Sequence, residues 1–287
     1  MSNKTPTPLF GPSGTSQRFY DEGGKTTLEA LPWVANLGLN AYEYSFGRGV
    51  NMGEDTARAI GQAVKANKLT LSVHGPYYIN LNNTDKEKLA TNLEWFTKAC
   101  TAAQWMGADR VIFHPGSTRG GDRAEALAVA AQNLQIFITL LRDAGLLEGI
   151  SLCPETMGKV NQLGNLDEML ELCQVDKCVV PCIDFGHLHA ASQGALNCDE
   201  AAQNVLDTME KALGKVRCRN FHMHFSPIEY GKAGEIRHRK FGEGYGPDFL
   251  PVAKAVKQKA WAPRVLCESQ GTQADDALAM KAVWEGL

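Results

Sequence analysis

The sequence predicts an α/β protein of the (β/α)8 TIM barrel class. Short β-rich runs alternate with longer segments of helical period along the whole chain, and eight of each can be counted. Side chains that bind metals fall at the ends of six of these β-rich runs. Neither a G-x-G-x-x-G loop nor a P-loop follows an early run, which disfavours a doubly wound open sheet.

The β-rich runs are the expected strands of the barrel. The segments between them place apolar residues three and four positions apart, as at Leu28, Leu31 and Ala35, which is the period of a helix. In chain order the expected strands are Pro8–Gly11, Ala41–Ser45, Leu69–His74, Arg110–His114, Ile150–Glu155, Val179–Asp184, Asn220–Phe225 and Arg264–Glu268.

Length and composition fit a single domain that spans residues 1–287. The chain is 44% hydrophobic, which suffices for one large core, and barrels reach this length without a second domain. Because 29 Lys and Arg stand against 32 Asp and Glu, no overall positive field attracts nucleic acid. Any DNA binding therefore needs a local basic patch.

The chain shows no sign of export. Met1–Pro8 is polar without an apolar signal region, and no run of about 18 uncharged apolar residues occurs. The eight cysteines are scattered and form no C-x-x-C pair, so we expect reduced thiols, most of them buried. We expect a cytoplasmic monomer that does not bind membranes.

One segment, Ser226 to Gly246, is too long for an ordinary connection between a strand and a helix. It is glycine-rich and charged, and loops of this length in barrels usually serve function. We expect it to cover the C-terminal face of the barrel, where the active sites of such enzymes lie.

Histidines and acidic residues at the strand ends predict a metal centre. The carboxyl ends of all strands of a parallel barrel meet on one face, so these side chains converge. Nearby carboxylates in a partly dry pocket repel by several kcal/mol, as an order of magnitude, unless protons or cations neutralise them. The predicted ligands are His74, His114, Glu155, Asp184, His224 and Glu268. Mixed imidazole and carboxylate ligation favours zinc, with manganese second.

The motifs around these residues resemble the endonuclease IV family of apurinic/apyrimidinic endonucleases, within the xylose isomerase-like barrels. His74 opens His-Gly-Pro-Tyr-Tyr-Ile-Asn-Leu, His114 opens His-Pro-Gly-Ser, and Glu155 opens Glu-Thr-Met-Gly. Asp184 and His187 stand in Asp-Phe-Gly-His. Met223-His224, His238 before Phe-Gly-Glu-Gly, and the final Glu268 complete the match.

The resemblance implies how the ligands divide between metals. One metal would lie on His74, His114 and Glu155, and a second on Glu155, Asp184, His224 and Glu268, with Glu155 bridging the two. A hydroxide held between the metals would attack the phosphate on the 5′ side of an abasic sugar. The implied partner is duplex DNA with an abasic site.

The chain departs from the family at the third metal. The family holds that metal with the His of Asp-x-x-His and with an Asp-x-His pair, but Ile236 stands here at the Asp position. His187 and His238 are then left as two ligands, unless the loop shifts and Glu235 replaces the missing Asp. Thr118 and Ser226-Pro227 also differ from the family pattern.

Substrate contacts are expected on loops around the centre. Arg237 and Arg239 lie in the long segment and Arg48 follows the second strand, where each could contact a phosphate. The resemblance suggests that Tyr77 stacks on a base. Glu43 either joins the site or faces solvent, and His222 either packs or supports His224.

Two other functions fit the same residues. A sugar isomerase or epimerase of the superfamily would hold one metal on Glu155, Asp184, His224 and Glu268 and use Glu155 and Glu268 as acid and base on a small sugar or phosphorylated substrate. A non-catalytic metal-binding barrel is the third reading. His74 and His114 distinguish them, because only a second metal requires these imidazoles.

Overall fold

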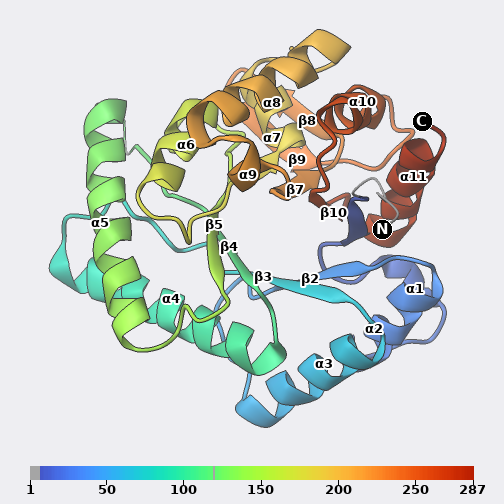
Figure 1. The fold of residues 1–287 in the computed structure, drawn as a ribbon, viewed down its shortest axis with the longest axis horizontal. Coiled ribbons are helices and arrows are strands. Elements are labelled where there is room, and N and C mark those ends of the chain that lie inside the picture. Colours follow the sequence, from blue (N-terminus) through green and yellow to red (C-terminus); the bar gives the residue numbers. More distant parts are fainter. Residues whose placement is uncertain (1–6, 119) are drawn as a thin grey trace.

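The strands form a closed parallel barrel surrounded by helices (Figure 1). The computed structural model describes residues 7–118 and 120–287, so most of the Met1–Pro8 segment lies outside the described residues. The barrel strands are β1 (Leu9–Pro12), β2 (Ala41–Ser45), β3 (Thr70–His74), β4 (Arg110–Phe113), β5 (Ser151–Pro154), β6 (Cys182–Asp184), β7 (His222–Phe225) and β10 (Arg264–Cys267).

Two four-stranded parallel sheets, β2-β3-β4-β5 and β1-β10-β7-β6, make up the wall of the barrel. Two seams join them. Between β1 and β2, Asn40 N donates to Phe10 O at 3.0 Å and Gly14 N donates to Glu43 O at 2.9 Å. Between β5 and β6, Val180 N donates to Leu152 O at 2.9 Å. The eight strands therefore close in chain order, with β10 as the eighth, and the predicted fold class is confirmed.

Helices cover the outside of the barrel, and side chains cap several of their N-termini. Thr26 with Glu29 and Asn165 with Glu168 form capping boxes, which satisfy backbone N–H groups that lack a helical partner. The helices are α1 (Gln17–Asp21), α2 (Thr27–Asn36), α3 (Glu54–Ala66), α4 (Lys86–Met106), α5 (Arg123–Asp143), α6 (Leu166–Gln174), α7 (Phe185–Ala191), α8 (Asp199–Leu213), α9 (Lys215–Cys218), α10 (Phe249–Lys259) and α11 (Gln273–Glu285).

One helix among the described residues, α5, is long and apolar enough to cross a membrane by length and composition alone. A face of it that includes Leu134, Phe137 and Ile138 is buried. These side chains belong to the same hydrophobic cluster as the strands, so α5 packs as a covering helix of the barrel.

The long segment after β7 is not an irregular loop. It folds into an antiparallel hairpin of β8 (Ile228–Gly231) and β9 (Gly234–His238). The sequence predicted a long loop here without indicating strands, and the hairpin forms because residues of β8 and β9 pair with each other outside the barrel wall. The hairpin contains a register shift, with Glu229 opposite Arg237 but Tyr230 opposite Glu235, so Ile236 is an extra residue in β9.

The β1–β2 seam depends on a glycine. A Cβ added to Gly11 would lie 1.8 Å from Ala41 O and 2.3 Å from Ala41 C, and backbone atoms cannot yield as a side chain can. We predict that Gly11→Ala lowers the free energy of unfolding by about 1–3 kcal/mol or more, measured by denaturant titration. Gly286→Ala is the control, because Gly286 has a φ of −80° and the nearest atom to its Cβ would be Ala282 O at 3.4 Å, an ordinary van der Waals contact. Equal effects of the two substitutions would contradict this account of the seam.

Candidate metal centre

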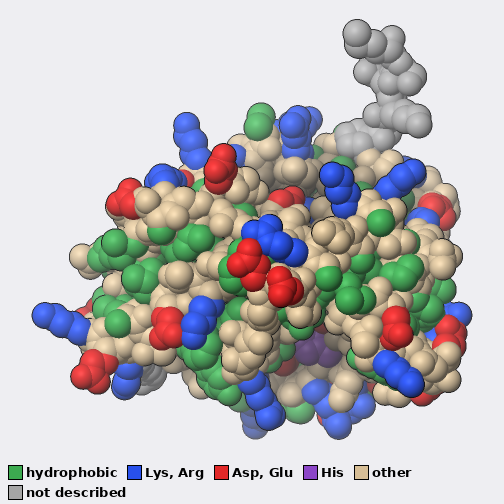
Figure 2. Space-filling view, turned by 90° about the horizontal axis from the view of Figure 1, so that it is seen from below, with side chains coloured by type: hydrophobic (Ala, Val, Ile, Leu, Met, Phe, Trp, Pro, Cys, Tyr) green, Lys and Arg blue, Asp and Glu red, His purple; other side chains and the backbone are tan. Residues whose placement is uncertain are grey.

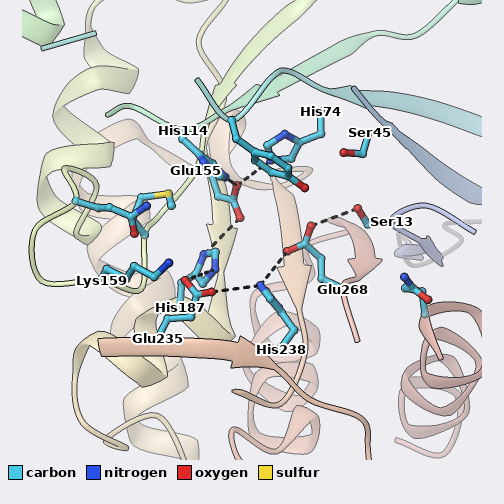
Figure 3. Close-up of a pocket in the computed structure, with 14 residues that line it drawn as sticks. Ser13, Ser45, His74, His114, Glu155, Lys159, His187, Glu235, His238 and Glu268 are labelled. Carbon is cyan, nitrogen blue, oxygen red and sulfur yellow. Dashed lines mark hydrogen bonds and ion pairs between the residues drawn. The ribbon is translucent and has the colours of Figure 1, made fainter. Parts of the chain in front are cut away.

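A cavity of about 510 Å³ opens at the carboxyl ends of the barrel strands, and most of the predicted ligands line it. Histidine side chains are visible inside a hollow of the surface, with Lys and Arg side chains near its edge (Figure 2). Most of the lining residues lie at or after the carboxyl ends of barrel strands, and two lie in the β8–β9 hairpin (Figure 3). Among the described residues, three groups of three or more metal-binding side chains meet around this cavity.

The first group is His74, His114 and Glu155. His74 ends β3, and His114 and Glu155 each follow the last residue of a strand. The Nε2 atoms of the two histidines lie 3.1 and 3.2 Å from the same oxygen, Oε2 of Glu155. The Nδ1 atom of His74 donates to Gly75 O at 2.8 Å, which leaves Nε2 free to bind a metal.

The second group is Glu155, Asp184, His224 and Glu268. The other oxygen of Glu155, Oε1, lies 3.0 Å from His224 Nδ1, and Glu268 Oε1 lies 3.5 Å from the same nitrogen. Asp184 Oδ1 accepts from His187 N at 2.7 Å and so caps α7. Asp184 Oδ2 is buried without a hydrogen-bond partner among the described residues, which fits a ligand atom that awaits a cation.

Glu155 belongs to both groups. Its side chain is 1% exposed, and its two oxygens face different sets of imidazoles. Burial alone would raise the pKa of Glu155, but the charge of His224 and hydrogen bonds from His114, His224 and His74 hold that pKa well below its usual range. A buried carboxylate with one oxygen toward each group is suited to bridge two metal ions.

Imidazolium charges balance the carboxylates where no cation is present. Burial lowers the pKa of His187, but Asp184, Glu155, Glu235 and Glu268 together raise it to about 9. Burial and the neighbouring Glu155 charge raise the pKa of Glu268. Divalent cations would replace these protons, since a metal binds the neutral imidazole and the ionised carboxylate.

The third group is His187, Glu235 and His238. The family pattern predicts the acidic ligand at position 236, but here Glu235 supplies it. Glu235 Oε2 lies 3.5 Å from His187 Nε2, and Oε1 lies 3.9 Å from His238 Nε2. The extra residue Ile236 explains the change. A bulge reverses which face a residue occupies, so Glu235 faces the cavity with His238 although three positions separate them, and Ile236 is 56% exposed.

Neighbouring residues hold the third group in place. His187 Nδ1 donates to Thr156 O at 2.8 Å, and His238 Nδ1 lies 2.7 Å from Ser226 Oγ, so each Nε2 is turned toward Glu235. A Cβ on Gly158 would lie 2.8 Å from the Glu235 Cβ and 3.0 Å from the His187 ring. Only glycine leaves room there for both ligands. Ser226, where the family differs, thus supports His238 directly.

The predicted substrate contacts are placed unequally. Tyr77 lines the cavity, is 56% exposed, and stacks on His114 with ring centroids 5.5 Å apart. Arg237 and Arg239 both bind the carboxylate of Glu229 and lie outside the cavity lining. Arg48 is exposed and also lies outside the lining. The structure therefore brings one of the four predicted contacts to the centre, and the roles of the arginines stay predictions.

Sequence reasoning missed Lys159 and underrated Glu43. Lys159 is exposed in the loop after β5, lines the cavity, and forms no ion pair with a described residue (Figure 3). Glu43 does not face solvent, because it is completely buried beneath the centre. Glu43 lies in the middle of β2 and not at its end, and its side chain points into the barrel interior, which the sequence pattern did not reveal.

Comparison with known proteins gives the family. A model of the xylose isomerase-like TIM barrel matches residues 31–283. The chain belongs to the xylose isomerase-like TIM barrel family. TIM barrel enzymes carry their active sites at the carboxyl ends of the strands, which is where the ligand groups of this chain lie.

Individual relatives within this family carry different names. The uncharacterized protein MJ0133 of Methanocaldococcus jannaschii is 33% identical over 95% of this chain and 96% of its own length. A probable endonuclease 4 of Acholeplasma laidlawii is 32% identical over 68% of this chain, and the match spans 65% of that protein. The crystal structure of a D-tagatose 3-epimerase-like protein superposes with a TM-score of 0.71 at 18% identity over 96% of both chains, which shows the shared fold.

We predict that Glu235→Gln removes one equivalent of bound zinc per chain. The amide keeps the size of the side chain but lacks the anionic oxygen that would join the two imidazoles. Metal content after gel filtration, measured by atomic emission, checks this. Glu229→Gln on the same hairpin is the matched control, since Glu229 pairs with arginines outside the cavity. Unchanged zinc in Glu235→Gln would show that Glu235 is not a ligand.

Proposed function

We propose that the protein is a metal-dependent phosphodiesterase that cleaves DNA on the 5′ side of abasic sites. Zinc is the preferred metal and manganese the alternative. The observation that carries the proposal is the meeting of three ligand groups around one cavity, two of which share Glu155. A single-metal isomerase has no use for the His74–His114 pair or for the His187–Glu235–His238 group.

The bound cations would supply Lewis acidity, which makes water nucleophilic near neutral pH and stabilises charge on phosphate oxygens. The residues of the chain define the rest. Glu155 belongs to the first two ligand groups and so fixes the distance between them. Because Oδ1 of Asp184 caps α7, its Oδ2 stays directed at the second ligand group. Glu268, whose pKa burial and the Glu155 charge raise when no metal is bound, would lose its proton on binding the cation of the second group.

The entrance of the cavity suits an abasic nucleotide. The Tyr77 ring stacks on His114 with its outer part exposed, so a base beside the abasic site has a flat partner. Lys159 places a positively charged side chain in the lining of the cavity. Its backbone pairs with Gly234, which fixes the loop after β5 against the hairpin. We assign it to the phosphate next to the scissile bond.

A sugar epimerase is the second candidate, because Glu155, Asp184, His224 and Glu268 form a complete single-metal group on their own. The epimerase reading also agrees with the lack of overall positive charge. It predicts that His74 and His114 are dispensable, which is the point at which the two proposals separate.

We expect metal-dependent cleavage of duplex DNA that contains one tetrahydrofuran abasic analogue. Activity should disappear after chelation, return with zinc or manganese, and leave a 3′-hydroxyl, as resolved on a denaturing gel. His74→Ala should lose at least about 100-fold in rate together with bound metal, because it removes a ligand of the first group and one of the imidazoles that face Glu155. The undamaged duplex is the substrate control. Folded, metal-loaded protein that cuts nothing would favour the epimerase, whereas full cleavage by His74→Ala would show that the first ligand group does not take part in the reaction.

The role of Lys159 can be separated from metal binding. We expect Lys159→Gln to raise KM for the abasic duplex about tenfold, since a charge-assisted hydrogen bond to phosphate contributes roughly 1.5–3 kcal/mol. Zinc content should stay unchanged. Lys232→Gln, at the exposed turn of the hairpin outside the cavity lining, is the matched control. Equal KM values for the two variants would remove Lys159 from substrate binding.

A further inference from the structure

A buried polar layer lies beneath the metal centre, inside the barrel and outside the cavity lining. It consists of Glu43 on β2, Ser72 on β3, Arg110 on β4 and His222 on β7. Glu43, Ser72 and His222 are completely buried, and Arg110 is 8% exposed. Polar groups at this depth are costly unless each is hydrogen-bonded.

Glu43 is the centre of this layer. Its Oε1 lies 2.9 Å from His224 Nε2 and accepts from Ser13 Oγ at 3.1 Å. Its Oε2 lies 3.1 Å from His222 Nε2 and accepts from Ser72 Oγ at 2.8 Å. Four donors thus meet one carboxylate, and one of them belongs to a predicted metal ligand, His224.

Arg110 fixes the direction of these hydrogen bonds. Its Nη1 lies 3.4 Å from His222 Nδ1, and its Nη2 donates to Asn220 O at 2.6 Å. A guanidinium can only donate, so His222 Nδ1 accepts and the hydrogen of this ring is on Nε2. His222 therefore donates to Glu43, and Glu43 remains an acceptor for His224.

The consequence for His224 is a single orientation and a single tautomer. When Nε2–H donates to Glu43, the other nitrogen, Nδ1, is left for the group formed with Glu155 and Glu268, 3.0 and 3.5 Å away. Ser13 Oγ also lies 3.2 Å from Glu268 Oε1, so Glu43 contacts two members of that group, one directly and one through a hydroxyl.

We propose that Glu43 is a positioning residue for the second metal ligand group: it holds His224 with its hydrogen on Nε2 and thereby presents Nδ1 to the metal. The proposal rests on the metal-binding part of the proposed function and not on the substrate. Carboxylates that support a metal-bound histidine in this way typically change metal affinity about 10- to 100-fold when removed.

Zinc binding by Glu43→Gln tests the proposal. The amide has the shape of the carboxylate, but its NH2 group must face at least one imidazole N–H that now lacks an acceptor. Titration with a chromophoric chelator should show one zinc equivalent bound about 10- to 100-fold more weakly, with the other equivalents unchanged. Wild-type affinity at every site in Glu43→Gln would overturn the proposal.

Two control variants separate positioning from general stability. Glu168→Gln removes a buried carboxylate that serves Arg123 and the α6 cap and lies outside the cavity lining, so it should lower stability without weakening zinc binding. Ser72→Ala removes one donor to Glu43 and leaves the His224 contact, so zinc affinity should change by less than about threefold. A loss of zinc affinity in Glu168→Gln as large as in Glu43→Gln would overturn the proposal.

Nitrogen NMR of histidine-labelled, zinc-loaded wild-type protein gives a test that does not depend on any variant. Long-range proton–nitrogen correlations should place the hydrogen of His224 on Nε2 and its metal on Nδ1. The reverse assignment would overturn the proposal, and so would an ion held by Cys182, His222 and His224, because Nε2 of His224 would then be a ligand. None of these measurements uses DNA, so a failure to cleave abasic sites would contradict the proposed function alone.

Discussion

The arrangement of the centre depends on the contacts of the Glu155 carboxylate with the surrounding histidines. Glu155 lies one residue beyond β5, is almost completely buried, and faces imidazoles from β3, β4 and β7 with two different oxygens. A charge in that position is tolerable only if cations surround it on both sides. The ligand groups would bring cations to both sides of Glu155. The supporting hydrogen bonds orient the ligands, and Gly158 leaves room for His187 and Glu235.

Much of this could be predicted from the sequence because a parallel barrel turns a linear pattern into a spatial one. All strands run in the same direction, so residues at the ends of β3, β4, β5, β6, β7 and β10 necessarily meet on one face. The eight strands were located with small errors at their ends. Six of the predicted strands were longer than the observed ones, as β6 shows, which begins at Cys182 and not at Val179; β2 matched, and β1 was shifted by one residue.

The rest could not be predicted because it depends on contacts between segments that lie far apart in the chain. Glu43 reaches His224 only because β2 and β7 face each other across the barrel interior. The place of Glu235 depends on a register shift inside a hairpin, and the sequence had indicated only a long loop there. Arg237 and Arg239 were expected to contact phosphate, but both form ion pairs with Glu229. The spacing of these residues in the sequence does not reveal this pairing.

The extra residue at Ile236 has a consequence for how such proteins change over time. A single inserted or deleted residue in β9 moves every later side chain to the opposite face, so an acid can be exchanged for its neighbour without any alteration of the backbone topology. The acidic ligand of the third group can therefore occupy either of two neighbouring positions in the sequence of this hairpin. A search for fixed motif spacing would classify the third group as lost, whereas the geometry retains it with a longer side chain.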